Sequence, residues 1–275
     1  MKSSLPSLLL AVAIVMAVIT AVPQGAPAFD HDYRQYASLL RECVRASRVD
    51  YARLRQGRAV LDAEVATLAE PSPAQERGWT NDQRLAFWIN AYNVLTLRAI
   101  VDHYPIRSSI FTLQPRNSIR QIDGVWTTLT WQAAGRTLTL DDIEHRILRP
   151  EFKEPRVHFA INCASVGCPP LAAEPYRPLT LDAQLDAAAR GYLSSERGLA
   201  IEDHTIRVTK ILEWYGEDFV GRFAPHAAGK SDRVEQAVRG VVTQFGPPQA
   251  AELARNPSTR IRFLDYDWSL NDAKP

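Results

Sequence analysis

The segment DQRLAFWINAYNVLTLRAIVDH, residues 82–103, carries apolar side chains on nearly every face of the helix that its pattern predicts. A helix that is apolar all round is buried on most of its sides. The preceding Trp79-Thr80-Asn81 is typical of a helix start, and Tyr104-Pro105 ends the helix. The segment therefore predicts a buried central helix against which the rest of the chain packs.

Two polar residues, Asn90 and Asn93, lie three positions apart inside this apolar segment. Residues at this spacing lie on neighbouring turns of a helix, and buried amides need hydrogen-bond partners. The two side chains therefore either tie an adjacent loop to the helix or line a cleft.

Helical and strand patterns mix in the rest of the chain. Apolar periodicity predicts helices within residues 31–69, 139–150, 179–192, 211–223 and 232–245. Alternation predicts hairpins within residues 119–140 and 199–209, and strands at 156–162 and 260–268. Helices first, then hairpins and helices mixed, predict an α+β fold: an antiparallel β-sheet with hairpins, packed against several α-helices that include the largely buried central one.

The N-terminus has the pattern of a secretory signal peptide. Lys2 precedes an apolar run from Leu8 to Val22, and Ala26-Pro27-Ala28 resembles a cleavage site. The apolar run is shorter than the roughly 20 residues that a spanning helix needs. We expect residues 1–28 to be removed, no stable membrane insertion afterwards, and a periplasmic or secreted protein with a single domain over residues 29–275.

The charge pattern argues against one class of partner. The formal net charge of +1 comes from 32 basic and 31 acidic residues. Loss of Lys2 would leave a nearly neutral chain with both signs interspersed, whereas a nucleic-acid binder normally shows a basic face. We therefore expect no nucleic-acid partner.

The segment RVHFAINCASVGCPP, residues 156–170, concentrates the residue types that carry chemistry. Two of the chain's three cysteines, Cys163 and Cys168, lie here, close to His158 and Asn162 and directly before a Pro-Pro pair. The pattern predicts a strand that runs into a turn. We expect the chemistry of the protein to be centred on this turn.

One interpretation makes Cys163 a thiol nucleophile with histidine as its base. Five residues of extended strand span about 16 Å, so His158 reaches Cys163 only if the chain turns back sharply. His145, beside Glu144 on a predicted short helix, is less constrained. The candidate catalytic residues are Cys163, His158, His145, Glu144, Asn162 and Asn90.

Two other interpretations of the cysteine turn stay open. Gly167 and the following prolines favour a compact turn in which a Cys163–Cys168 disulfide could form, and an exported protein meets oxidising conditions. His145, His158 and the two cysteines are also ligand types for zinc, but their spacing matches no recognised pattern. We expect neither a cofactor nor a resident metal.

Three motifs in the same order carry a family resemblance: FWINAYNVL, TLDDIEHRILRP and PRVHFAINCASVGCPPL. Together they resemble the bacterial branch of the family catalogued as domain of unknown function 547, over about residues 83–192. The family label implies a domain with marked positions and no established reaction. Those positions are Asn90, Tyr92, Asn93, Glu144, His145, His158, Asn162, Cys163, Ser165, Cys168 and Pro169.

Two hypotheses for function follow. The first is an exported cysteine-dependent hydrolase or acyl transferase that acts on an amide or ester in the cell envelope. The second is a non-catalytic ligand-binding or interaction module whose Cys163–Cys168 turn is a structural disulfide and whose tryptophans stack on a ligand. The ligand would be a small molecule, a peptide or a glycan, and the sequence predicts no oligomeric state.

Overall fold

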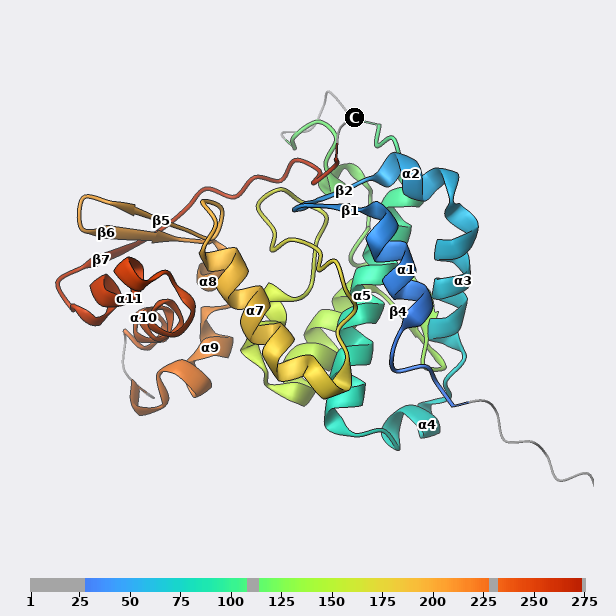
Figure 1. The fold of residues 1–275 in the computed structure, drawn as a ribbon, viewed down its shortest axis with the longest axis horizontal. Helices are drawn as coiled ribbons and strands as arrows, with labels where there is room; N and C mark the ends of the chain where they lie inside the picture. Colours follow the sequence, from blue (N-terminus) through green and yellow to red (C-terminus); the bar gives the residue numbers. More distant parts are fainter. Residues whose placement is uncertain (1–27, 108–113, 228–231, 274–275) are drawn as a thin grey trace, which may run out of the picture.

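The central helix forms as predicted. The computed structural model describes residues 28–107, 114–227 and 232–273, and in it α5 (Asn81–His103) runs through the larger part of the molecule (Figure 1). Thr80 begins α5 with a capping box, in which its hydroxyl accepts from the Gln83 N–H and the Gln83 side chain accepts from the Thr80 N–H. Every residue from 85 to 101 except Arg98 is buried, so α5 is enclosed on all sides.

Four short helices precede α5 and pack beside it. They are α1 (Arg34–Cys43), α2 (Tyr51–Gln56), α3 (Arg58–Ala69) and α4 (Pro73–Arg77). An antiparallel two-residue ladder of β1 (Val44–Arg45) and β2 (Arg48–Val49) separates α1 from α2. In Figure 1, α1 and α3 lie on the opposite side of α5 from the C-terminal elements.

Only the second half of the region predicted as hairpins, residues 119–140, forms one. Its first part is a 3₁₀ turn, η1 (Ile119–Gln121), and its second pairs β3 (Trp131–Ala133) with β4 (Arg136–Leu138). The predicted short helix follows as α6 (Leu140–Asp142), capped by Thr139, and continues as the π-helix η2 (Ile143–Phe152). Pro150 lies inside η2 and cannot donate a backbone hydrogen bond there.

The C-terminal third combines helices with a small sheet. Its helices are η4 (Pro178–Thr180), α7 (Leu181–Leu193), α8 (Ile211–Trp214), α9 (Gly216–Phe223), η5 (Pro225–Ala227), α10 (Arg233–Phe245) and α11 (Pro248–Arg255). Strands β5 (Leu199–Glu202) and β6 (Thr205–Val208) form the predicted hairpin. The predicted C-terminal strand is limited to β7 (Arg260–Phe263), which pairs with β6 in parallel.

The α+β fold is confirmed, and its apolar side chains form two clusters. One cluster surrounds α5 and the N-terminal helices; the other joins α7, the β5–β7 sheet, α9 and α10. The segment between them contributes to both, because Val157 and Ala160 belong to the first cluster and Phe159 to the second. This segment carries His158 and leads into the cysteine turn, which places the turn at the junction of the two clusters.

The strand predicted at residues 156–162 is wrong. The chain forms a 3₁₀ helix there, η3 (Pro155–Phe159), in which Pro155 is the first residue and the Glu154 side chain accepts from the Arg156 N–H. The apolar alternation that suggested a strand arises because Val157 and Phe159 enter different clusters. Since η3 is compact, the extended-strand separation between His158 and Cys163 does not apply.

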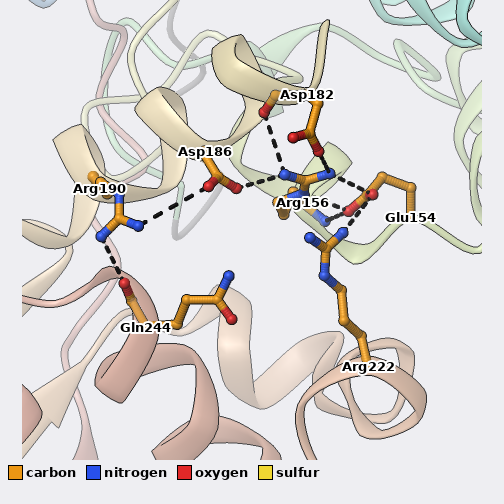
Figure 2. Close-up of polar contacts among 7 residues, drawn as sticks. All are labelled: Glu154, Arg156, Asp182, Asp186, Arg190, Arg222 and Gln244. Carbon is orange, nitrogen blue, oxygen red and sulfur yellow. Dashed lines mark hydrogen bonds and ion pairs between the residues drawn. The ribbon is translucent and has the colours of Figure 1, made fainter.

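An ion network centred on the buried Arg156 side chain stabilises η3 (Figure 2). The Arg156 side chain is only 4% exposed and contacts Glu154 at 2.8 Å, Asp182 at 2.7 Å and Asp186 at 2.5 Å. The network extends through Arg222, which donates to Glu154, and through Arg190, which donates to the Gln244 carbonyl oxygen. It therefore joins η3 to α7, α9 and α10.

The described residues contain no helix that is long and apolar enough to cross a membrane. The predicted signal peptide, apart from Ala28, lies outside the described residues.

Candidate active site

A cavity of about 540 Å³ brings together most of the predicted site residues. It is lined by Tyr92, Arg120, Trp126, Thr127, Asp141, Glu144, His145, His158, Ile161, Cys163, Cys168, Ile211, Trp214, Tyr215, Tyr266 and Trp268. Four of the six candidate catalytic residues, Glu144, His145, His158 and Cys163, are in this lining. The other two, Asn90 and Asn162, are buried and do not line it.

The two asparagines of α5 tie loops to the helix. The Asn90 side chain donates to the Tyr176 carbonyl oxygen at 2.8 Å and accepts from the Tyr176 N–H at 3.0 Å. The Asn93 side chain likewise donates to the Ala160 carbonyl oxygen at 3.0 Å and accepts from the Asn162 N–H at 2.8 Å. Asn93 therefore anchors the entry to the cysteine turn, whereas Asn90 anchors a more distant loop.

The Asn162 side chain stabilises the cysteine turn by hydrogen bonds to two of its backbone groups. Its carbonyl oxygen accepts from the Ala164 N–H at 3.0 Å, and its amide nitrogen donates to the Pro169 carbonyl oxygen at 2.7 Å. Ala164 has φ = 58°, a left-handed conformation that costs energy for an L-residue, and the bond to Asn162 stabilises it. A Cβ atom at Gly167 would lie 2.9 Å from the Asp267 nitrogen, so only glycine allows the C-terminal segment to pack this closely.

The Cys163 sulfur has three polar neighbours within hydrogen-bond distance, one of which, the Ser165 hydroxyl, also donates to the Tyr266 hydroxyl at 3.0 Å. Cys168 Sγ lies 2.8 Å away, the Tyr266 hydroxyl 3.1 Å and the Ser165 hydroxyl 3.2 Å. The hydrogen bond from the Cys168 thiol lowers the pKa of Cys163 most, the two hydroxyls lower it further, and burial opposes them. Burial and the adjacent Cys163 raise the pKa of Cys168. Cys163 is therefore the member of the pair that ionises, while Cys168 keeps its proton.

The Cys163–Cys168 disulfide, one of the interpretations of the turn left open above, is not present in this structure, in which all three cysteines are free. The two sulfurs form a hydrogen-bonded thiol pair, and the Cys163 N–H also donates to Cys168 Sγ at 3.0 Å. The shape of the turn, which the disulfide was expected to hold, is held by Asn93 and Asn162. Cys43 lies apart in α1, where burial raises its pKa to about 12.

His158 forms a histidine–aspartate pair. Its Nε2 lies 2.8 Å from the Asp218 carboxylate, which also forms a two-point ion pair with Arg149. Burial would raise the pKa of Asp218, but the hydrogen bonds from His158 and Arg149 hold it below its usual range. The ring stacks on Tyr215 with centroids 4.1 Å apart. Asp218 engages Nε2, which leaves Nδ1 as the ring nitrogen that can exchange a proton in the cavity that His158 lines together with Cys163.

His145 is differently placed. Its Nδ1 accepts a hydrogen bond from Arg149 at 2.8 Å, because the guanidinium can only donate. Its Nε2 lies 3.3 Å from the Asp141 carboxylate. Both ring nitrogens are therefore occupied, and the lone pair that a general base needs is engaged with Arg149. Of the two histidines, His158 is better suited to move a proton in the cavity.

Glu144 places a buried carboxylate beside the cysteine turn. It is 7% exposed, and its charge opposes ionisation of Cys163. Burial raises the pKa of Tyr215 most, and the negative charge of Glu144 raises it further. Glu144 therefore acts electrostatically on both walls of the cavity, and the donors around Cys163 must outweigh it.

Sequence reasoning missed Asp218 and Tyr266. Each meets its partner across a long stretch of chain, Asp218 to His158 over 60 residues and Tyr266 to Cys163 over 103. No local spacing signals such contacts.

The structure does not support the zinc interpretation of the cysteine turn. In the described part of the chain, no group of three or more His, Cys, Asp or Glu residues is arranged so that it could hold a metal ion.

Residues 76–193 match the family model described as Protein of unknown function, DUF547. This segment belongs to the DUF547 family. The chain matches no curated protein and no solved structure. The DUF547 segment contains η2, η3 and the cysteine turn, whereas Asp218, Tyr266 and Trp268 lie beyond its end. The cavity is thus completed by a part of the chain that the family model does not cover.

Proposed function

We propose that the chain is a cysteine-dependent hydrolase or acyl transferase that opens an amide or ester bond with Cys163. One observation carries the proposal: hydrogen bonds with Cys168, Ser165 and Tyr266 lower the pKa of Cys163 in a cavity that is also lined by His158, the partner of Asp218. The thiolate is the nucleophilic form of cysteine, and a histidine oriented by a carboxylate is the usual acid–base partner. No other described thiol combines a lowered pKa with a place in a cavity.

In the first step the Cys163 thiolate attacks the substrate carbonyl carbon. A carbon–sulfur bond forms, and the carbonyl electron pair moves to oxygen. When it returns, the bond to the leaving amine or alcohol breaks. His158, protonated at Nδ1 by the proton that Cys163 gave up, delivers that proton to the leaving group. Asp218 fixes the ring through Nε2 and stabilises its charged form, as the third member of a catalytic triad does.

In the second step an acceptor releases the acyl group from Cys163. His158, now neutral, takes a proton from water or from an acceptor nucleophile, which attacks the thioester carbon. The carbon–sulfur bond breaks, the carboxylic acid or transferred acyl product leaves, and the thiolate returns to its hydrogen-bond partners. Water as acceptor gives hydrolysis, and an amine or alcohol gives acyl transfer.

In this scheme a side chain, and not the backbone, donates a hydrogen bond to the carbonyl oxygen of the substrate. The nearest backbone groups are engaged, because the Cys163 N–H donates to Cys168 and the Ala164 N–H donates to Asn162. Tyr92 lines the cavity, and burial raises the pKa of its hydroxyl, which therefore stays protonated and able to donate. We assign Tyr92 to the developing oxyanion.

The cell envelope is the proposed place of action. The N-terminal pattern of Lys2, an apolar run and Ala26-Pro27-Ala28 supports export. N-terminal sequencing of the protein from a periplasmic or culture fraction should give Phe29 as the first residue. A chain that keeps Met1 and stays in the cytosol would contradict export.

An acyl-enzyme experiment tests the chemistry. The mature protein is mixed with an activated ester such as p-nitrophenyl acetate, quenched in acid and mapped by mass spectrometry. We expect a burst of p-nitrophenol and an acetyl group on Cys163, with none in Cys163→Ser and an unchanged yield in Cys43→Ser. His158→Gln should slow removal of the acetyl group. Acetylation that spares Cys163 in a folded protein would overturn the proposal.

A second candidate is a non-catalytic binding module. The exposed Trp214, stacked on Trp268 at the cavity, favours it because such rings bind flat ligands. In that case Cys163→Ser would leave ligand binding unchanged and no acyl-enzyme would form with any ester. The two candidates therefore give opposite results in the same experiment.

A further inference from the structure

The cavity is lined by one arginine of the described residues, Arg120, and no described carboxylate forms an ion pair with it. The undescribed residues contain no Asp or Glu. Arg149, in contrast, is held by Asp218, and Arg156 by three carboxylates. The Arg120 guanidinium is therefore free to bind an anion that enters the cavity.

An aromatic ring holds this guanidinium in place. Its central carbon lies 4.7 Å from the centre of the Trp268 ring. Stacking of this kind leaves the edge of the guanidinium free to donate to an oxyanion, a geometry that suits arginine and not lysine. Trp268 thus orients Arg120 without neutralising it.

A continuous aromatic surface leads from Arg120 to the nucleophile. The Trp268 ring lies 4.6 Å from the Tyr266 ring, and the Tyr266 hydroxyl lies 3.1 Å from Cys163 Sγ. Trp214 packs on both rings, with centroids 4.9 Å from Tyr266 and 5.8 Å from Trp268. A ligand that lies along these rings has one end at Arg120 and the other at Cys163.

Charged residues are distributed unevenly around the cavity. The carboxylates of Asp141 and Glu144 belong to α6 and η2, and Asp141 is paired with His145. Arg120 belongs to another element, η1, and it shares a neighbouring cavity with Asp123, which does not line this one. An anionic group is attracted by Arg120 and repelled by the carboxylates of α6 and η2.

We infer that the substrate of Cys163 carries an anionic oxygen group, a carboxylate or a phosphate, that Arg120 binds while the body of the substrate lies on Trp268 and Tyr266. The inference rests on the proposed function, because it names the substrate class of that same nucleophile. It adds a specificity residue that touches substrate away from the reacting atoms.

Tailed alkylating probes test this assignment. Cys163 is alkylated with N-iodoacetyl amines that end in a carboxylate, a phosphonate or a neutral amide, in series of increasing chain length, and labelling is mapped by mass spectrometry. At the length that spans from Cys163 to Arg120, we expect the anionic probes to react about fivefold faster than the amide. The preference should fall at high salt, because Arg120 is exposed. The faster of the two anions identifies the group.

Matched variants give the result a control. Arg120→Gln should abolish the preference for the anionic probes and leave the rate with iodoacetamide unchanged, and Arg120→Lys should restore only part of it. Arg255→Gln removes the same charge at an exposed site outside the cavity and should change nothing. Equal rates for anionic and neutral probes at every length, or equal effects of the two glutamine variants, would overturn the inference. Slow iodoacetamide alkylation of the wild type would instead count against the proposed function.

Discussion

The two sides of the cavity are built in different ways. On the reaction side, His158 is buried and Cys163 is half-buried, and their polar groups are held by partners such as Cys168 and Asp218. On the aromatic side, Trp214 is 46% exposed and Arg120 has no carboxylate partner in the part of the chain that the structure describes. The polar groups of the reaction side already have their partners in the free protein, whereas Arg120 and Trp214 on the aromatic side are available to contact a ligand. Chemistry and recognition are thus divided between them.

Removal of the nucleophile should have the largest effect. Cys163→Ala should lower turnover of any ester substrate by at least about 10⁴-fold, because no other group can form the acyl-enzyme. Cys43→Ala is the control: this thiol lies in the hydrophobic cluster around α5, and burial raises its pKa to about 12. Turnover that survives in the Cys163 variant, measured by product release, would place the chemistry elsewhere.

The His158–Asp218 pair comes next. Asp218→Asn should lower turnover about 10²- to 10⁴-fold, because the ring loses the carboxylate that fixes its tautomer and stabilises its charged form. Labelling of Cys163 by iodoacetamide should change far less. An equal loss in labelling and turnover would show that Asp218 acts through the fold and not through proton transfer.

The same variant carries a pH signature in stability. Because the folded-state pKa of Asp218 lies below its usual value, its stabilising effect is present above the unfolded-state pKa of about 3.9 and is lost as the pH falls below it. Urea denaturation should therefore show a gap between wild type and Asp218→Asn at neutral pH that narrows in acid. A gap that stays constant down to acid pH would contradict the pairing.

Variants of the two asparagines of α5 distinguish an effect on the site from an effect on the stability of the fold. Asn93→Ala and Asn90→Ala should each lower the free energy of unfolding by about 3 kcal/mol, because each leaves a backbone N–H and a carbonyl oxygen without a partner. Only Asn93→Ala should also slow alkylation of Cys163, since Asn93 anchors the cysteine turn. Equal alkylation rates in the two variants would show that the turn holds its shape without Asn93.

Loss of single donors to the thiolate should have a smaller effect. Cys168→Ala and Tyr266→Phe each remove a hydrogen bond that stabilises the charged form of Cys163, so the pKa of Cys163 should rise. Alkylation at neutral pH should slow by about tenfold, more for Cys168→Ala, whose thiol lowers the pKa most. Ser165→Ala should follow the same direction. Faster alkylation in any of these variants would contradict the assignment.

The aromatic side should give the smallest change. Trp214→Ala removes an exposed stacking surface, so KM should rise by about fivefold while kcat stays the same. A fall in kcat instead would mean that the aromatic side takes part in the reaction.

Local sequence patterns predicted much of the fold. The apolar run of α5 and its Thr80 start, and the hairpin of β5 and β6, all depend on neighbouring residues and formed as expected. The η3 segment did not, because alternation looks the same whether apolar residues enter one sheet face or two separate clusters. Of the site, the cysteine turn and its histidine were visible in sequence. Asp218, Tyr266 and the aromatic side were not, because tertiary contacts alone bring them to Cys163.

The central claim is that the structure makes Cys163 a stabilised thiolate. The most direct measurement is the pH dependence of iodoacetamide alkylation at Cys163, mapped by mass spectrometry on the folded protein without reductant. A midpoint well below the value of about 8.5 for a free thiol is the predicted result. A midpoint at or above that value, or a Cys163 that is already joined to Cys168, would contradict it.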